Sequence, residues 1–91
     1  METKTQVGDV VQATAGRDKD GYFLVVGETE TSVTIVNGKT RKIKSPKTKS
    51  KKHTKIILSG ADKPLAERIA QGKPTSNKKV ISVVSQVKKS K

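Results

Sequence analysis

The chain has no cysteine and no tryptophan, and Tyr22 and Phe23 are its only tyrosine and phenylalanine. The absence of cysteine excludes a disulfide framework, a thiolate metal site and a cysteine nucleophile. Two neighbouring aromatic residues cannot form the stacking platform that sequence-reading binders of single-stranded nucleic acid require. Only 31% of the 91 residues are hydrophobic, so the chain can build one small domain but not a large core around a deep substrate pocket.

Residues with catalytic or metal-binding chemistry are equally scarce. His53 is the single histidine and has no acidic neighbour in the sequence, so neither a two-histidine metal site nor a triad-like pair is expected. Asp18 and Asp20 lack the further ligands of a calcium-binding loop, and residues 72–75 lack the glycine spacing of a P-loop. We therefore expect no enzyme activity, no catalytic residue, no metal site, no cofactor and no small-molecule substrate.

Long apolar segments are also missing. No apolar run approaches the ~20 residues that span a bilayer, and residues 1–5 lack the apolar segment of a secretory signal peptide. On these grounds we expect a cytoplasmic protein without a membrane partner.

Positive charge, by contrast, is abundant and unevenly distributed. Lysine and arginine number 20 against 8 acidic residues, which gives a net charge of +12. Residues 1–43 contain six basic and six acidic side chains, whereas residues 44–91 contain fourteen basic and two acidic ones. No acid occurs between residues 39 and 55. Such an excess indicates an anionic partner.

The kind of cation indicates how that partner is bound. Lysines outnumber arginines 17 to 3, and lysine acts as a point charge on phosphate, whereas arginine can read a base edge through two hydrogen bonds. We therefore expect binding to follow the backbone and shape of a nucleic acid and to weaken steeply with salt. The candidate RNA-binding residues are Arg17, Lys19, Lys39, Arg41, Lys42, Lys44, Lys47, Lys49, Lys51, Lys52, His53 and Lys55.

The first sixty residues have the pattern of short strands separated by tight turns. Strands are predicted over residues 7–15, 22–27, 32–36, 39–43 and 54–58. The second of these is apolar on both faces, as in a strand covered from two sides. Because no helix separates the strands, a parallel α/β fold is excluded, and the pattern favours a small twisted barrel.

Two turns are predicted from their residues. Gly16 ends the first strand, and the charged turn after it contains Asp20-Gly21, a pair that tolerates a positive φ. Asn37-Gly38 has the signature of a two-residue type I′ hairpin turn, which would lead the chain directly into the strand at 39–43.

Beyond Gly60 the pattern becomes helical. Asp62 can cap a short helix over residues 64–70, with Pro64 in its first turn and Gly72 as its stop. A second helix is predicted after the capping residues 75–77. Its signal is an apolar stripe at helical spacing, which outweighs the strand preference of β-branched residues and consists of Val80, Val83, Val84 and Val87. We expect these apolar faces to pack on each other or on the barrel.

The chain resembles a KOW motif over residues 8–27, GDVVQATAGRDKDGYFLVVG: a strand, an Ala-Gly-Arg-Asp-Lys turn and a second apolar strand. Residues 33–43, VTIVNGKTRKI, and residues 51–53, KKH, resemble the continuation of that domain. The similarity extends over about residues 7–58 and, more loosely, over the helices. It is to the KOW-domain large-subunit ribosomal proteins of archaea and eukaryotes, and to short bacterial KOW-domain RNA-binding proteins.

The resemblance implies an SH3-like β-barrel that binds RNA through its first turn and the neighbouring basic loops. On that pattern Arg17, Lys19, Arg41 and Lys42 face the RNA, and Gly16 is the glycine that the turn needs for its backbone angles. The implied partners are RNA, above all ribosomal RNA, and proteins of the large ribosomal subunit.

Together these patterns predict a mainly β (α+β) protein. Residues 1–60 are expected to form a small five-stranded SH3-like barrel with a basic loop at 44–55, and residues 61–91 a basic extension with one or two short helices. The composition of residues 44–53 favours disorder until a phosphate partner binds. The expected function is that of a ribosome-associated RNA-binding protein, which contacts phosphates through the KOW turn and the lysine-rich loop.

Two other functions stay open. The chain could be a KOW adaptor that contacts the transcription or translation machinery by protein–protein interaction, which an exposed valine stripe in the second helix would favour. Alternatively, the lysine run alone could bind DNA or anionic lipid without a shaped site.

Overall fold

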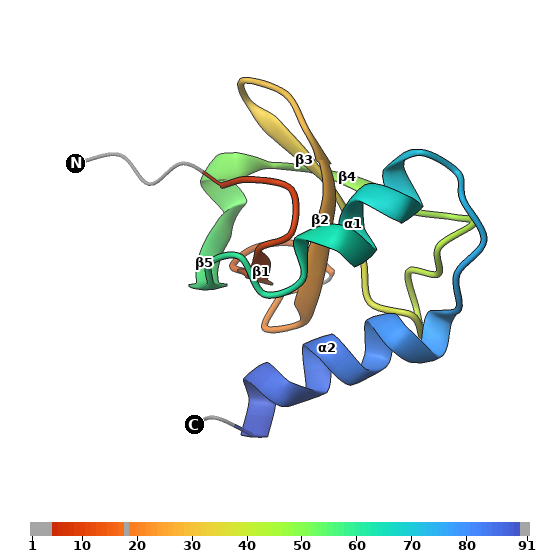
Figure 1. Ribbon diagram of the computed structural model, residues 1–91. Helices are drawn as coiled ribbons and strands as arrows, with labels where there is room; N and C mark the ends of the chain where they lie inside the picture. The colour runs from red at the N-terminus through yellow and green to blue at the C-terminus, as the bar shows by residue number, and fades with distance from the viewer. Residues whose placement is uncertain (1–4, 18, 90–91) are drawn as a thin grey trace.

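Five antiparallel strands followed by two helices make up the computed structural model, which describes residues 5–17 and 19–89 (Figure 1). The elements are β1 (Val10–Ala13), β2 (Tyr22–Glu28), β3 (Ser32–Val36), β4 (Lys47–Ser50), the 3-10 turn η1 (Lys51–His53), β5 (Thr54–Leu58), α1 (Lys63–Ala70) and α2 (Asn77–Lys89). The strands pair in the order β4-β3-β2-β1-β5. The α+β class, both helices and four of the predicted strands are confirmed, although β1 is shorter than the predicted 7–15 and the remaining strand lies at Lys47–Ser50 instead of 39–43.

The sheet is curled but not closed. Its two edge strands, β4 and β5, are joined by the three residues of η1. The backbone N–H of Lys51 donates to the Thr31 carbonyl (2.8 Å), and the N–H of Thr14 donates to the His53 carbonyl (2.9 Å). These bonds attach η1 to the β2–β3 turn at one end and to the end of β1 at the other. Among the described residues no pairing joins β4 to β5, so the sheet is open.

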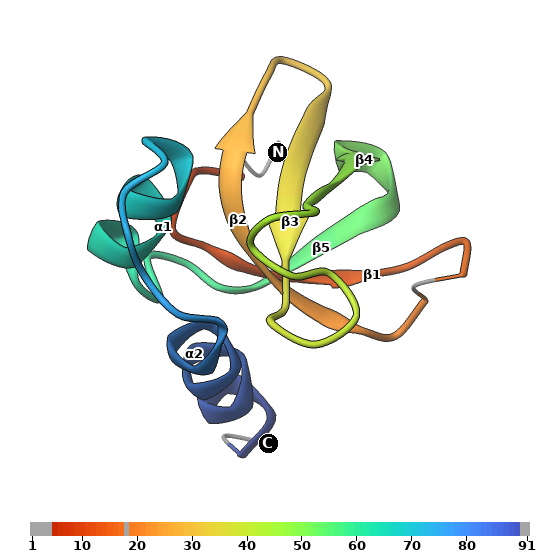
Figure 2. The same cartoon turned by 90° about the vertical axis from the view of Figure 1, so that its right-hand side faces the viewer.

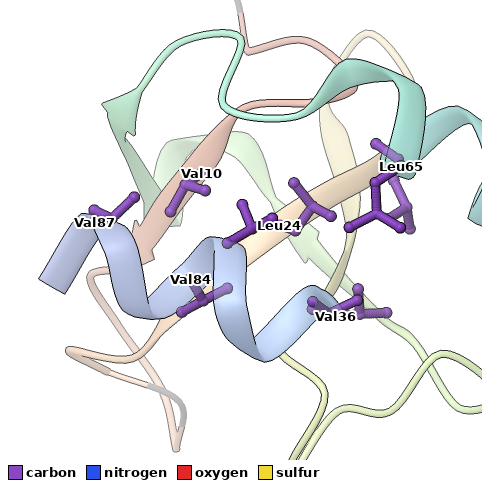
Figure 3. Packing of buried hydrophobic residues seen from close by; sticks show 10 residues of the cluster. Val10, Leu24, Val36, Leu65, Val84 and Val87 are labelled. Atoms are coloured by element: carbon purple, nitrogen blue, oxygen red, sulfur yellow. The ribbon is translucent and has the colours of Figure 1, made fainter. Parts of the chain in front are cut away.

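Both faces of the sheet carry a hydrophobic cluster, because successive side chains of a strand point to opposite faces. The inner cluster lies inside the curl and contains Val11, Ala13, Phe23, Val25, Val33 and Ile35. The outer cluster lies between the sheet and the helices (Figure 3) and contains Val10, Leu24, Val26, Val36, Leu65, Ala66, Val80, Val83, Val84 and Val87. The prediction that residues 22–27 are covered from two sides is confirmed.

The first helix begins and ends where the sequence predicts. The Asp62 carboxylate accepts a hydrogen bond from the N–H of Leu65 (3.1 Å), and Pro64 lies in the first turn. Gly72 follows the last turn with a φ of +74°, and its N–H donates to the Ile69 carbonyl (3.1 Å). A left-handed glycine at this position is a common way for a helix to stop.

The valine stripe of α2 is buried against the sheet, as expected for packing. Val80 is fully buried and Val83 is only 9% exposed, and Figure 3 shows Val84 and Val87 directed toward the strands that carry Leu24 and Val10. Tertiary burial therefore outweighs the strand preference of valine. Within the described residues, neither helix is long and apolar enough to cross a membrane.

The predicted strand at 39–43 and its two-residue hairpin turn are wrong. The Asn37 side-chain Oδ1 accepts hydrogen bonds from the N–H groups of Lys39 and Arg41, both at 2.9 Å. The Arg41 carbonyl accepts the N–H of Asn37 (2.8 Å). Asn37 thus organises a wider loop over residues 37–46, which we call the β3–β4 loop.

Contacts with α2 explain why this loop leaves the sheet. Gly38 has a φ of +82°, and a Cβ at this position would lie 2.6 Å from the Asn77 carbonyl oxygen and 2.7 Å from Ile81 Cγ1. The N–H of Ile43 donates to the Asn77 side-chain oxygen (2.9 Å). The N-terminal end of α2 therefore holds residues 38–43, and β3 pairs instead with β4.

The disorder expected for residues 44–53 is contradicted over residues 47–53. Residues 47–55 form β4, η1 and the start of β5. They are ordered by pairing with β3 and β1, which their composition does not reveal.

The close approach of Gly38 to α2 yields a stability prediction. Gly38→Ala should lower the free energy of unfolding for two reasons. An alanine in the left-handed region costs about 1–2 kcal/mol, and overpacking of its Cβ against α2 costs about 1–3 kcal/mol more. Gly72→Ala is the control, because Gly72 also has a positive φ but nothing lies within 4 Å of its Cβ position. Urea unfolding of both variants measures the difference, and equal losses would contradict the contact.

Candidate nucleic-acid interface

The loop between β1 and β2, residues 14–21, is a closed turn that presents Arg17 and Lys19 to solvent. Gly16 and Asp20 have φ values of +82° and +72°, so the predicted need for left-handed backbone is confirmed at both. The loop is fastened at its base, where Ala13 exchanges hydrogen bonds with Asp20 and Gly21 at 2.7 and 2.9 Å. It projects from the sheet on the side away from the two helices (Figure 2).

Lys49 of strand β4 extends to the same loop. Lys47 and Lys49 lie opposite Ile35 and Val33 in the sheet, and directly paired residues point to the same face. The lysine stems therefore cover the open side of the inner cluster, and Lys49 is only 9% exposed. Its Nζ lies 3.1 Å from the position of a Cβ on Gly16. The stem is buried while the charged end reaches the β1–β2 loop.

The 3-10 turn η1 lies against the base of that loop. Lys52 and His53 are exposed, and the His53 carbonyl holds the N–H of Thr14. Lys51 instead forms an ion pair with Glu28 (3.0 Å). The structure thus joins the two predicted sets, the first turn and the Lys-Lys-His stretch, into one surface. We call it the turn cluster and define it as Arg17, Lys19, Lys49, Lys52 and His53.

The β3–β4 loop carries a second group of cations. Lys39, Lys42 and Lys44 are exposed and Arg41 is half-buried. This loop lies beside the N-terminal end of α2 (Figure 1). Its first lysine, Lys39, lines a small hollow together with the end of the β1–β2 loop.

Lys55 lies on the outer face of the sheet. It pairs with Gln12 in β1, which in turn pairs with Tyr22 in β2. Paired residues share a face, so these three side chains form a row across the sheet. Tyr22 therefore lies between Lys55 on one side and the strand that leads into the β3–β4 loop on the other.

Several acidic side chains in the described residues are engaged elsewhere. Asp9 is 2% exposed and accepts the N–H groups of Gln6 (2.9 Å) and Gly60 (2.8 Å). Asp62 caps α1, and Glu28 pairs with Lys51. Asp9 and Asp62 are therefore held in the fold, whereas Glu28 neutralises one predicted cation, Lys51, and the exposed Asp20 lies in the β1–β2 loop beside Lys19.

Two hollows on the surface are lined by described residues. The first, of about 90 Å³, lies between the start of β2, the β3–β4 loop and α2. The second, of about 390 Å³, lies between α1 and α2 and is lined by residues that include Leu65, Arg68, Ser82 and Val83. Within the described residues no group of three histidine or acidic side chains is placed to hold a metal ion.

Neither a scan against protein-family models nor a search of the curated proteins finds a match for this chain. Its function is therefore inferred from the side chains and the geometry described above.

The buried stem of Lys49 yields a second prediction. Lys49→Ala should lower the free energy of unfolding by about 1–2 kcal/mol, because each buried methylene contributes about 0.8 kcal/mol. Lys52→Ala, which removes an exposed lysine, should change it by less than about 0.5 kcal/mol. Lys49→Met restores the stem and should recover more than half of the loss. Thermal and urea unfolding check this, and equal effects at both positions would contradict the packing role of Lys49.

Proposed function

We propose that this chain is an RNA-binding protein of the KOW type, which contacts phosphates of ribosomal RNA through the β1–β2 loop and the cations of residues 39–55. The observation that carries the proposal is the turn cluster. There, the Lys49 Nζ lies beside Gly16 of the β1–β2 loop, and the hydrogen bond between Thr14 and His53 fixes η1 against the base of that loop. A converging set of cations is what recognition of a phosphate backbone requires.

An SH3-like barrel is the finer description of the fold that accompanies this proposal. Five short antiparallel strands curl around the inner cluster, and the two edge strands are separated along the chain by only three residues. A small sheet with that connection is close to the geometry of a closed barrel. The KOW resemblance of residues 8–27 points the same way.

The chemistry of the cations favours phosphate over base edges. The turn cluster and the β3–β4 loop expose six cationic side chains, and five of them are lysines. Lysines act as point charges. The exception, Arg17, lies at the tip of the loop, where a bidentate contact with one phosphate is sterically open. Proteins of the large ribosomal subunit would then be neighbours of the bound chain.

The adaptor function has less support. It was expected to use an exposed valine stripe, but Val80 and Val87 are 0% and 3% exposed and the stripe faces the sheet. Non-specific binding by a loose lysine run is also disfavoured, because residues 47–55 are held in strands and a 3-10 turn.

A pair of matched variants tests the turn cluster. Arg17→Ala with Lys52→Ala should weaken binding to a ribosomal RNA hairpin about tenfold and reduce the slope of log K against log salt by about 2. Lys63→Ala with Lys73→Ala removes the same charge from exposed positions near α1 and should change the affinity about twofold or less. Fluorescence anisotropy across salt concentrations measures both.

For the wild-type protein, the slope of log K against log salt indicates how many phosphates are bound. About five phosphate contacts predict a slope of about −3.5 to −4.5. A slope near −1, or equal losses in the two double variants, would show that no fixed set of cations binds the RNA.

Sedimentation of the tagged protein from gently lysed cells tests the ribosomal partner. We expect co-migration with the large ribosomal subunit in a sucrose gradient, surviving at the higher of two salt concentrations because a shaped site holds several contacts. The Arg17→Ala/Lys52→Ala variant should shift toward the top of the gradient, and the Lys63→Ala/Lys73→Ala variant should not. Wild-type protein found only at the top at both salt concentrations would overturn the ribosomal assignment.

A further inference from the structure

The smaller hollow lies between the start of β2, the β3–β4 loop and α2. It measures about 90 Å³ and is lined by Gly21, Tyr22, Asn37, Lys39, Ile81, Val84 and Ser85. A single water needs only about 10–15 Å³ in this measure, so the hollow has room for one flat ring. The helix α2 forms one side and the sheet with its loops forms the other.

The walls of the hollow suit a ring with polar edges. Ile81 and Val84 of α2 give the hollow an apolar lining, and Tyr22 is the aromatic residue in it. Ser85 adds a hydroxyl group, whereas the Asn37 side chain is held within the β3–β4 loop by its hydrogen bonds to residues 39–41. Small sites of this kind hold a ligand by apolar contact and orient it with a few polar groups.

Cations flank the hollow on both sides. Lys39 belongs to its lining, and Lys55 lies beyond Gln12 in the row that includes Tyr22. The β1–β2 loop ends at Gly21, which also lines the hollow. A nucleotide whose base entered here would have its own phosphate and those of its neighbours within reach of these cations.

We propose that the hollow is a binding site for one unpaired nucleobase, extruded as a bulge from otherwise paired RNA. The inference rests on the proposed RNA-binding function and adds a specificity site to it. The site takes a single base, because Tyr22 is the only aromatic residue among those that line the hollow, so the lining offers no second ring to stack the next base. The flanking cations bind the backbone on either side, where the helix remains paired.

Two hairpin RNAs of identical stem, one with a single bulged adenosine and one fully paired, test the proposal. The wild-type protein should bind the bulged hairpin about tenfold more tightly, as expected for one base stacked on an aromatic side chain. Ser85→Leu fills the hollow and should reduce this preference to about twofold or less. Binding to the paired hairpin should stay unchanged, because the cations are intact.

Ser82→Leu is the matched control. Ser82 lies on the same helix but lines the other hollow, between α1 and α2, so the preference for the bulge should persist in this variant. Tyr22→Leu is a second test variant. It keeps an apolar side chain against the outer cluster, on which Tyr22 packs, and should also lose the preference for the bulged hairpin. Circular dichroism and urea unfolding establish that each variant is folded.

The outcomes separate this site from the proposed function. Equal wild-type affinity for the two hairpins, or a preference that survives in both Ser85→Leu and Tyr22→Leu, would overturn the base site while RNA binding stands. Failure to bind either hairpin would overturn the RNA-binding function itself.

Discussion

Burial of both faces of β2 is the constraint on which the rest of the molecule depends. With only 31% hydrophobic residues, the chain must cover two sheet faces from a small supply of apolar side chains. The helices cover the outer face with their valine stripe, and the curl of the sheet encloses the inner one. The open side of the inner cluster is covered by the stem of Lys49. A residue that completes the core therefore also delivers charge to the turn cluster.

The second organising element is Asn77, which links the end of the chain to its middle. Its side chain accepts the N–H of Ile43, and its carbonyl lies close to Gly38. Because the β3–β4 loop is held by this helix end, Lys39 lies beside the start of β2, where the small hollow forms. The C-terminal helix thus belongs to the candidate interface, although it carries none of the cations in the turn cluster.

The parts of the fold that the sequence predicts are those encoded by neighbours along the chain. An apolar run identifies β2 and alternation identifies β3, and the Asp62 cap and the valine stripe identify the helices. The strand at Lys47–Ser50 has no apolar residue, so only its pairing with β3 makes it a strand. The error at 39–43 has the same origin, because the partner of Ile43 is a residue 34 positions away. Arg17 and Lys19 are predicted from the residues of the turn, whereas the role proposed for Tyr22 depends on its position beside α2, for which the sequence gives no local signal.

The open sheet leaves two strand edges whose backbone groups could pair with another molecule. Exposed edges of this kind invite intermolecular association, and charged side chains on them oppose it. Here β4 carries Lys47 and Lys49, and β5 carries Lys55. Like charges would be brought together if two such edges met, so the lysines oppose association through these edges. If the proposed RNA binds and neutralises these lysines, it must also shield the edges that they protect.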